Sequence, residues 1–225
     1  MTSLAIAIEE IQPPQRGRKS HTTDPRPLDP LPVIQLHFYS PTCESHFREA
    51  TYLQPPTSNL WAKAQLFRVP PPSAAPANGQ EWTYYVSQGV DRSTGQLVFG
   101  LMRTPLPPHG ARIEAQYGNH LILASAEESH LLHGERAVQA RIKPGGDYIV
   151  FAFPNLGVLQ TGHYVLCYKV FAHSSPTPAP IATCFGAPFT IFTSAQFPGL
   201  LPTTPLTASL ASLNIPGVHN RRPRE

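Results

Sequence analysis

The sequence predicts an all-β protein, most simply a two-layer β-sandwich with long proline-rich loops. Proline accounts for 27 of the 225 residues, and helices do not tolerate such a content, because each interior proline removes a backbone donor and clashes with the preceding turn. Short apolar runs also follow one another at close intervals, separated by turn residues. Hydrophobic residues make up 41% of the chain, which is enough for a sizeable core.

The apolar runs predict strands in order along the chain. The first run alternates Leu4, Ile6 and Ile8 with alanine and glutamate, a period of two that indicates a short strand. The later runs span residues 33–39, 60–69, 82–86, 96–102, 148–153, 164–171 and 185–192. In the run 60–69, Trp61 or its neighbours are expected to face the core. Pro188 interrupts the last run, which is typical of an edge strand or a bulge.

Two segments depart from this pattern. Residues 121–141 are compatible either with a helix or with a strand followed by a turn. Near the end, Thr204 can cap a helix with Pro205 at its first position. Leu206, Leu210 and Leu213 then lie on one face of that helix. Because the helix is short, it must dock against the body of the protein to persist.

Positive charge is concentrated at the two ends of the chain. The formal net charge is only +3, but four cations against one acid, Asp24, lie between residues 16 and 26. These cations are Arg16, Arg18, Lys19 and Arg26, and a second group comprises Arg221, Arg222 and Arg224. Such segments are typical of arms that contact nucleic acid or of import signals, although two solvated tails would look the same.

A proline-rich brace links the first basic group to the strand 33–39. Its prolines are Pro25, Pro27, Pro30 and Pro32, and their fixed backbone angles favour a rigid extended lead-in. We expect Arg16, Arg18 and Lys19 to hold DNA phosphates, since arginine binds phosphate bidentately and can also contact guanine edges. Arg26 is expected either to contact DNA with them or to anchor the brace by pairing with Asp24 or Asp29.

The sequence carries no pattern for catalysis or metal binding. Its three cysteines, Cys43, Cys167 and Cys184, are odd in number and widely spaced, which argues against a disulfide framework or a zinc site. The ten histidines lack ligand spacing, and no nucleophile elbow, phosphate loop or paired-carboxylate motif is present. We therefore expect no enzymatic activity, no cofactor and no bound metal. Neither a signal peptide nor a transmembrane helix is expected.

Three segments together resemble the velvet domain of fungal regulatory proteins. They are residues 26–36 (RPLDPLPVIQL), 151–164 (FAFPNLGVLQTGHY) and 188–199 (PFTIFTSAQFPG), in the order in which the family carries its motifs. Arg16 and Arg18 also fall where the family often carries an arginine-containing arm. The resemblance covers residues 4–40 and 148–222 well. It implies a single velvet domain over residues 1–222, with a variable insertion at 70–147 and a tail at 223–225.

The resemblance implies an immunoglobulin-like β-sandwich similar to Rel-type transcription factors. It further implies a dimer with itself or with another velvet protein, and a location in the nucleus with shuttling to the cytoplasm left open. Family members regulate fungal development, sporulation and secondary metabolism, and some bind promoter DNA through the arm. Phe189, Phe192 and Phe197 are expected either to pack the closing helix or to form a surface for the partner.

The chain departs from the family pattern at three positions. Asn155 replaces the usual aspartate, Leu159 the usual basic residue and Gln196 the usual lysine. This loss of charge motivates a second hypothesis, in which the protein binds no DNA itself and serves as an interaction subunit of another velvet protein. A third reading, an enzyme or a carbohydrate-binding sandwich, has no motif to support it.

Overall fold

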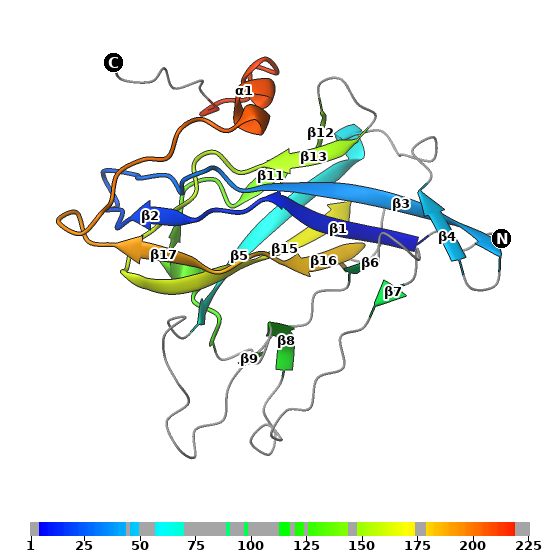
Figure 1. Ribbon diagram of the computed structural model, residues 1–225, viewed down its shortest axis with the longest axis horizontal. Helices are drawn as coiled ribbons and strands as arrows, with labels where there is room; N and C mark the ends of the chain where they lie inside the picture. The colour runs from blue at the N-terminus through cyan, green and yellow to red at the C-terminus, as the bar shows by residue number, and fades with distance from the viewer. Residues whose placement is uncertain are drawn as a thin grey trace.

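Strands dominate the structure, as the sequence predicts. The computed structural model describes residues 5–43, 46–49, 57–69, 89–90, 97–98, 113–117, 120–123, 126–143, 148–173 and 179–218. Within these ranges two larger sheets face each other, and a single α-helix lies outside them (Figure 1). The prediction of an all-β sandwich with a short C-terminal helix is therefore confirmed.

The first sheet has five strands, which all pair in antiparallel fashion. Its strands are β1 (Ala5–Gln12), β3 (Val33–Cys43), β4 (His46–Glu49), β12 (Arg141–Ile142) and β13 (Ile149–Ala152). Strand β3 lies at the centre and pairs with β1 on one side and β13 on the other. Leu36 consequently lies opposite both Ile8 and Ile149.

The second sheet has six strands and contains the basic arm at one edge. Its strands are β2 (Arg16–Arg18), β5 (Leu60–Val69), β11 (Ala137–Gln139), β15 (Gly162–Ala172), β16 (Ala182–Phe185) and β17 (Phe189–Phe192). The spatial order is β11-β5-β15-β17-β2, with β16 also paired to β15. Only the β17–β2 pair of this sheet is parallel.

The remaining described elements are short. They are the pairs β6 (Gly89–Val90) with β7 (Leu97–Val98), β8 (Ile113–Tyr117) with β9 (His120–Leu123), and β10 (Leu132–His133) with β14 (Gly157–Val158), and the 3-10 turns η2 (Thr57–Asn59) and η4 (Ser129–Leu131). The ambiguous segment 121–141 thus contains short strands and a 3-10 turn, and no α-helix is formed in its described part.

The core lies between the two sheets and follows from the alternation of side chains along each strand. The inward residues of the three longest strands are Ile34, Leu36 and Phe38 of β3, Leu60, Ala62, Ala64 and Leu66 of β5, and Tyr164, Leu166, Tyr168 and Val170 of β15. The neighbours of Trp61 therefore face the core. Trp61 itself lies on the outer face, where its ring stacks on that of Phe171 at 4.4 Å.

Helix α1 (Pro205–Ala211) covers the outer face of the first sheet (Figure 1, orange). As predicted, Thr204 is the N-cap, and its hydroxyl accepts a hydrogen bond of 3.0 Å from the backbone N–H of Thr207. Leu210 is fully buried in a cluster with Val33 and Val150. The other two leucines of the predicted face, Leu206 and Leu213, pack at the margin of the same cluster.

The predicted strands can now be compared with the structure. The run 60–69 coincides with β5. Of the run 185–192, the part after Pro188 forms β17, whereas β16 shares only Phe185 with this run and begins at Ala182, before it. Of the run 96–102, only Leu97–Val98 is described, as β7. The run 82–86 lies outside the described residues. In the arm, for which no strand was predicted, Arg16–Arg18 form β2.

Candidate nucleic-acid interface

Residues Arg16–Arg18 of the arm form the edge strand β2, and the glycine at its centre allows β2 to lie close against its neighbours. Gly17 lies opposite Ile191 of β17 and is buried. A Cβ atom on Gly17 would lie 2.6 Å from the Cδ1 atom of Ile191 and 3.0 Å from the Cδ2 atom of Leu28, so glycine alone fits without displacement of a neighbour. Because side chains alternate along a strand, Arg16 and Arg18 point away from the core.

The chain after the arm is held by backbone and side-chain hydrogen bonds. The N–H of Lys19 donates to the carbonyl of Phe192, and that of Ser20 donates to the carbonyl of Val158, each at 2.8 Å. The Ser20 side chain is 1% exposed. Its hydroxyl accepts from the N–H of Arg26 at 2.9 Å and donates to the carbonyl of Arg26 at 3.1 Å. These bonds close the loop 20–26 and fix the direction of the arm.

The proline brace holds the other edge of the arm. The carbonyl of Asp29 accepts hydrogen bonds from the N–H groups of Gln15 and Arg16, and the N–H of Asp29 donates to the carbonyl of Arg16. Leu28 is 1% exposed and its N–H donates to the carbonyl of Leu156. Strand β2 is therefore bonded on both sides, and the arginines project from a fixed backbone.

The three cations that we expected to contact DNA are open to solvent. Lys19 is exposed, and Arg16 and Arg18 are half-exposed. None of the three forms a salt bridge with a carboxylate of the described residues. The guanidinium of Arg18 lies 5.9 Å from the centre of the Phe197 ring, in a cation–π contact that restrains it. The arm thus presents three cations that form no salt bridge within the described residues, although Asp24 lies near enough to Arg18 for the arginine to lower the pKa of its carboxyl.

Arg26 differs from the other three cations. Its guanidinium forms a salt bridge of 2.6 Å with Asp24, and its Nη1 atom donates to the Ser194 hydroxyl at 3.0 Å. The hydrogen bond from Arg26 lowers the pKa of the Asp24 carboxyl, and the nearby charges of Arg18 and His21 lower it further. Of the two expectations for Arg26, the geometry favours the anchor paired with Asp24.

The aromatic residues expected at a partner surface occupy different environments. Phe189 is 2% exposed and packs against Tyr164 in the main core, at 6.2 Å between ring centres. Its ring therefore offers no surface to a partner in this fold, and it does not touch the helix cluster. Phe192 and Phe197 are half-exposed beside the arm, and a partner surface at these two rings stays a prediction.

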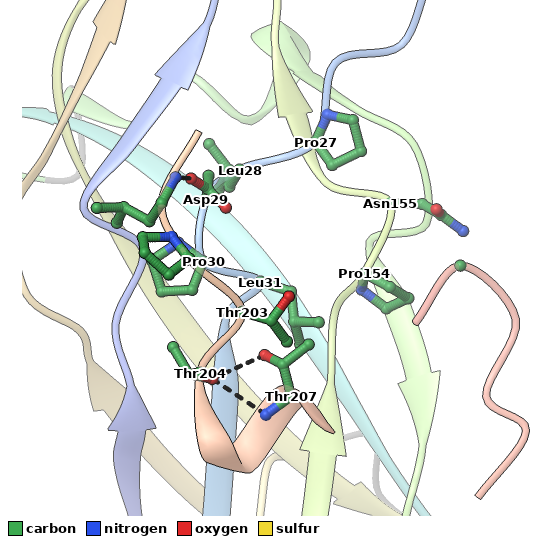
Figure 2. A pocket seen from close by; sticks show the side chains of 13 residues that line it. Pro27, Leu28, Asp29, Pro30, Leu31, Pro154, Asn155, Thr203, Thr204 and Thr207 are labelled. Atoms are coloured by element: carbon green, nitrogen blue, oxygen red, sulfur yellow. Dashed lines mark hydrogen bonds between the residues drawn. The ribbon is translucent and has the colours of Figure 1, made fainter. Parts of the chain in front are cut away.

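A pocket of about 210 Å³ lies where the brace meets the C-terminal segment (Figure 2). Its lining comprises Pro27, Leu28, Asp29, Pro30, Leu31, Pro154, Asn155, Leu201, Pro202, Thr203, Thr204, Thr207 and Gly217. The Asp29 carboxylate accepts a hydrogen bond from the N–H of Leu201. The buried Gln12 amide donates to the carbonyl of Leu31 and to the Thr207 hydroxyl. Polar bonds thus tie the brace to the helix around this pocket.

Sequence reasoning overlooked one half-buried acid, Glu10 of β1, whose carboxyl points into the core. The Tyr168 hydroxyl and the N–H of Ala187 donate to its carboxyl at 2.6 and 2.5 Å. Burial raises the pKa of Glu10 to about 7, although both hydrogen bonds act in the opposite direction. The sequence does contain a pattern that indicates this position. Glu10 continues the alternation of Ile6 and Ile8, so its side chain points inward with theirs.

The described ranges were also compared with the features of a metal site, a membrane-spanning helix and a reactive or bridged cysteine. No three histidine, cysteine, aspartate or glutamate side chains gather there as metal ligands. No helix among the described residues is long and apolar enough to cross a bilayer. Cys167 and Cys184 are buried and form no disulfide within the described residues, and burial raises the pKa of Cys184.

Comparison with known proteins agrees with this geometry. The family model of the Velvet factor matches residues 6–222. A probable velvet family sexual development regulator of Laccaria bicolor is 30% identical, over 93% of this chain and 68% of its own length. A second protein of that description, from Schizophyllum commune, is 29% identical over 95% of this chain and 71% of its own length.

A sexual development regulator of Mycosarcoma maydis is 27% identical over 91% of this chain, which spans 42% of that protein. The match to the family model thus includes the arm, the brace, both sheets and the closing helix. The chain belongs to the velvet family.

Proposed function

We propose that this protein regulates sexual development in a fungus and binds promoter DNA through its arm. The names of the similar proteins support the developmental role. One observation carries the DNA contact: Arg16 and Arg18 project from an edge strand that is hydrogen-bonded on both sides, and no described carboxylate pairs with them. A protein that grips a phosphate backbone requires cations held in this manner.

The fixed arm favours binding because little conformational entropy is lost when it docks. Arg16 and Arg18 supply bidentate contacts to phosphate, or to a guanine edge where the arm reaches a groove. Lys19 adds a point charge. Phosphate contacts set the register of the protein on the duplex, and a few base contacts supply sequence preference.

The remaining parts of the proposal rest on family membership. The protein acts in the nucleus as a dimer, either with itself or with another velvet protein, and it also affects sporulation and secondary metabolism. Phe192 and Phe197, half-exposed beside the arm, are the residues we assign to the partner surface.

A mobility-shift titration with duplex promoter DNA at a series of salt concentrations tests the DNA contact. The variant Arg16→Ala, Arg18→Ala, Lys19→Ala should lose most of its binding. Its plot of log affinity against log salt should flatten by up to about 2.7 for three lost phosphate contacts. The control Arg141→Ala, Lys143→Ala removes charge from β12 of the other sheet and from the residue that follows it, and it should bind like the wild type. Equal binding by the arm variant would reject the assignment.

A second candidate is an interaction subunit that binds no DNA itself. Asp24 occupies the guanidinium of Arg26, and Leu159 and Gln196 stand where the family usually has basic residues, which favours this candidate. Co-purification with a second velvet protein, combined with no DNA shift by this chain alone at low salt, would support it over the first.

A further inference from the structure

Two lysines lie directly opposite each other on the second sheet, away from the arm. Lys63 of β5 pairs in register with Lys169 of β15. Their other cross-strand neighbours are neutral, because Lys63 also lies opposite Ala137 of β11, and Lys169 opposite Thr183 of β16. Like charges at directly opposite positions disfavour the pairing of two strands. The folded chain alone gains nothing from this arrangement.

No described carboxylate compensates for the two charges. Lys63 is exposed and Lys169 half-exposed, and neither forms a salt bridge within the part of the chain that the structure describes. Gln65, the next outward residue of β5 after Lys63, binds the acid Glu127. Glu127 accepts hydrogen bonds from Gln65 and Ser129, each at 2.8 Å. The lysine pair is therefore a site of uncompensated positive charge.

The pair has an aromatic border that fixes its position. In the next row of the sheet, Trp61 lies opposite Phe171, and the two rings stack at 4.4 Å with an interplanar angle of 14°. The rings restrain the two strands beside the lysines, while the ammonium groups can extend into water on their long stems.

The lysine pair lies on the same face of the same sheet as the arm. The residues next to each lysine, such as Ala62 and Tyr168, are in the core, so both lysines point outward. Gly17 contacts the core residues Ile191 and Leu28, so Arg16 and Arg18 point outward as well.

The separation along this face suits one DNA duplex. Arg16 lies opposite Thr190, which lies opposite His163 of β15. Lys169 follows His163 by six residues on the same strand, about 20 Å at the usual rise. One turn of B-DNA is about 34 Å long, so this spacing lies within a single turn. The outward side chains between the two groups on β15, Val165 and Cys167, are buried in a cluster with Phe67 and Phe185, so a duplex would pass over the residues that cover this cluster.

We propose that Lys63 and Lys169 form a second contact to the DNA phosphate backbone, separate from the arm and on the same sheet face. The inference rests on the DNA binding proposed above and adds a binding surface to it. It explains why two like charges persist opposite each other: a phosphate placed between or above them converts a mutual repulsion into two attractions.

The test is a salt titration of duplex binding with the variant Lys63→Gln, Lys169→Gln. Glutamine keeps most of the side-chain length and removes the charge. The slope of log affinity against log salt should decrease in magnitude by about 1.8, as expected for two lost phosphate contacts. The single variant Lys63→Gln should give about half of that change. The control Arg141→Gln, Lys143→Gln removes the same charge at the end of β12 of the other sheet and should leave the slope unchanged.

Thermal unfolding of the same variants separates binding from folding. The Lys63→Gln, Lys169→Gln protein should melt no lower than the wild type, because it has lost a like-charge contact. A lower melting temperature would mean that the lysines serve the fold, and it would overturn the inference.

The outcomes distinguish the two proposals. In one outcome, the wild type binds DNA, the arm variant binds more weakly, and the lysine variant has the wild-type salt slope. The second contact is then wrong, and the proposed function stands. If the control lowers the slope as much as the lysine variant does, net charge explains the effect and the second contact is also wrong. If the wild type binds no duplex at any salt concentration, both proposals fail.

Discussion

The hydroxyl of Tyr168 donates a hydrogen bond of 2.6 Å to the carboxyl of Glu10 and so joins the two sheets through the core. Glu10 belongs to β1 of the first sheet and Tyr168 to β15 of the second. Burial raises the pKa of Tyr168 as well, and the adjacent Glu10 raises it further. The tyrosine therefore remains a neutral donor, and the protonation state of Glu10 controls this contact.

Stability should fall as the pH rises toward neutrality, and Glu10 is the cause we expect. Its pKa is about 7 in the folded protein, compared with an ordinary value of 4.5. Between these values the folded state holds a proton that the unfolded state has released, so the free energy of unfolding decreases with pH and levels off above about 7. The contribution is about 3 kcal/mol, and urea unfolding across this range measures it.

The variant Glu10→Gln is the control for this pH dependence. Its amide is neutral at every pH, and it can accept from the N–H of Ala187 while donating to the Tyr168 hydroxyl. The variant should lose the fall in stability between pH 4.5 and 7 and should be at least as stable as the wild type in mildly alkaline buffer. Parallel profiles for the two proteins would show that Glu10 does not titrate in this way.

Replacement of Gly17 by alanine should weaken DNA binding although every cation of the arm remains. The new Cβ would meet the side chains of Ile191 and Leu28 and push β2 away from β17, so Arg16 and Arg18 would lose their fixed direction. Overpacking of this kind costs about 1–3 kcal/mol. The paired measurements are a mobility shift and urea unfolding. Wild-type affinity in a folded Gly17→Ala protein would contradict the role of the strand.

The sequence predicted the long strands well because their local signals agree with their final environment. The run 60–69 alternates small or apolar residues with polar ones over residues 62–66 and stops at Pro70, and β5 has the same limits as the run. Pro188 lacks a backbone donor, and β16 and β17 are separated there. Threonine is a favoured helix cap and proline a favoured first helical residue. The local pattern of Thr204 and Pro205 was therefore sufficient to place the start of α1.

Strand β2 and the inward carboxyl of Glu10 were missed because their contacts depend on distant partners. Residues 16–18 have no strand pattern of their own. They form β2 because β17, far along the chain, offers a free edge. The alternation along β1 places Glu10 on the inward face, but its partners there are Tyr168 of the opposite sheet and Ala187, which lies between β16 and β17. The pairing of Lys63 with Lys169 likewise requires the register of β5 on β15, which neither segment specifies alone.

Loss of the helix cap should destabilise the protein without affecting the arm directly. In Thr204→Ala, the N–H of Thr207 loses its acceptor and the buried Gln12 amide loses the hydroxyl that donates to it. Cap substitutions cost about 0.5–2 kcal/mol, and the stranded amide brings the expected loss toward the upper limit. Urea unfolding measures it. Ser212→Ala, at an exposed position of the last turn, should cost much less, and equal losses would count against the cap.

Asparagine in place of Asp24 should strengthen DNA binding. The carboxylate of Asp24 holds Arg26 at 2.6 Å and also lies near the charges of Arg18 and His21, so it competes with phosphate for the cations of the arm. Removal of this charge frees Arg26 to contact DNA, and the salt slope should steepen by about 0.9 for one added phosphate contact. Glu135→Gln changes the charge equally at another exposed position and should leave the slope as it is. If Asp24→Asn binds as the wild type does, or more weakly, then Arg26 serves only as the anchor of the brace and the competition does not exist.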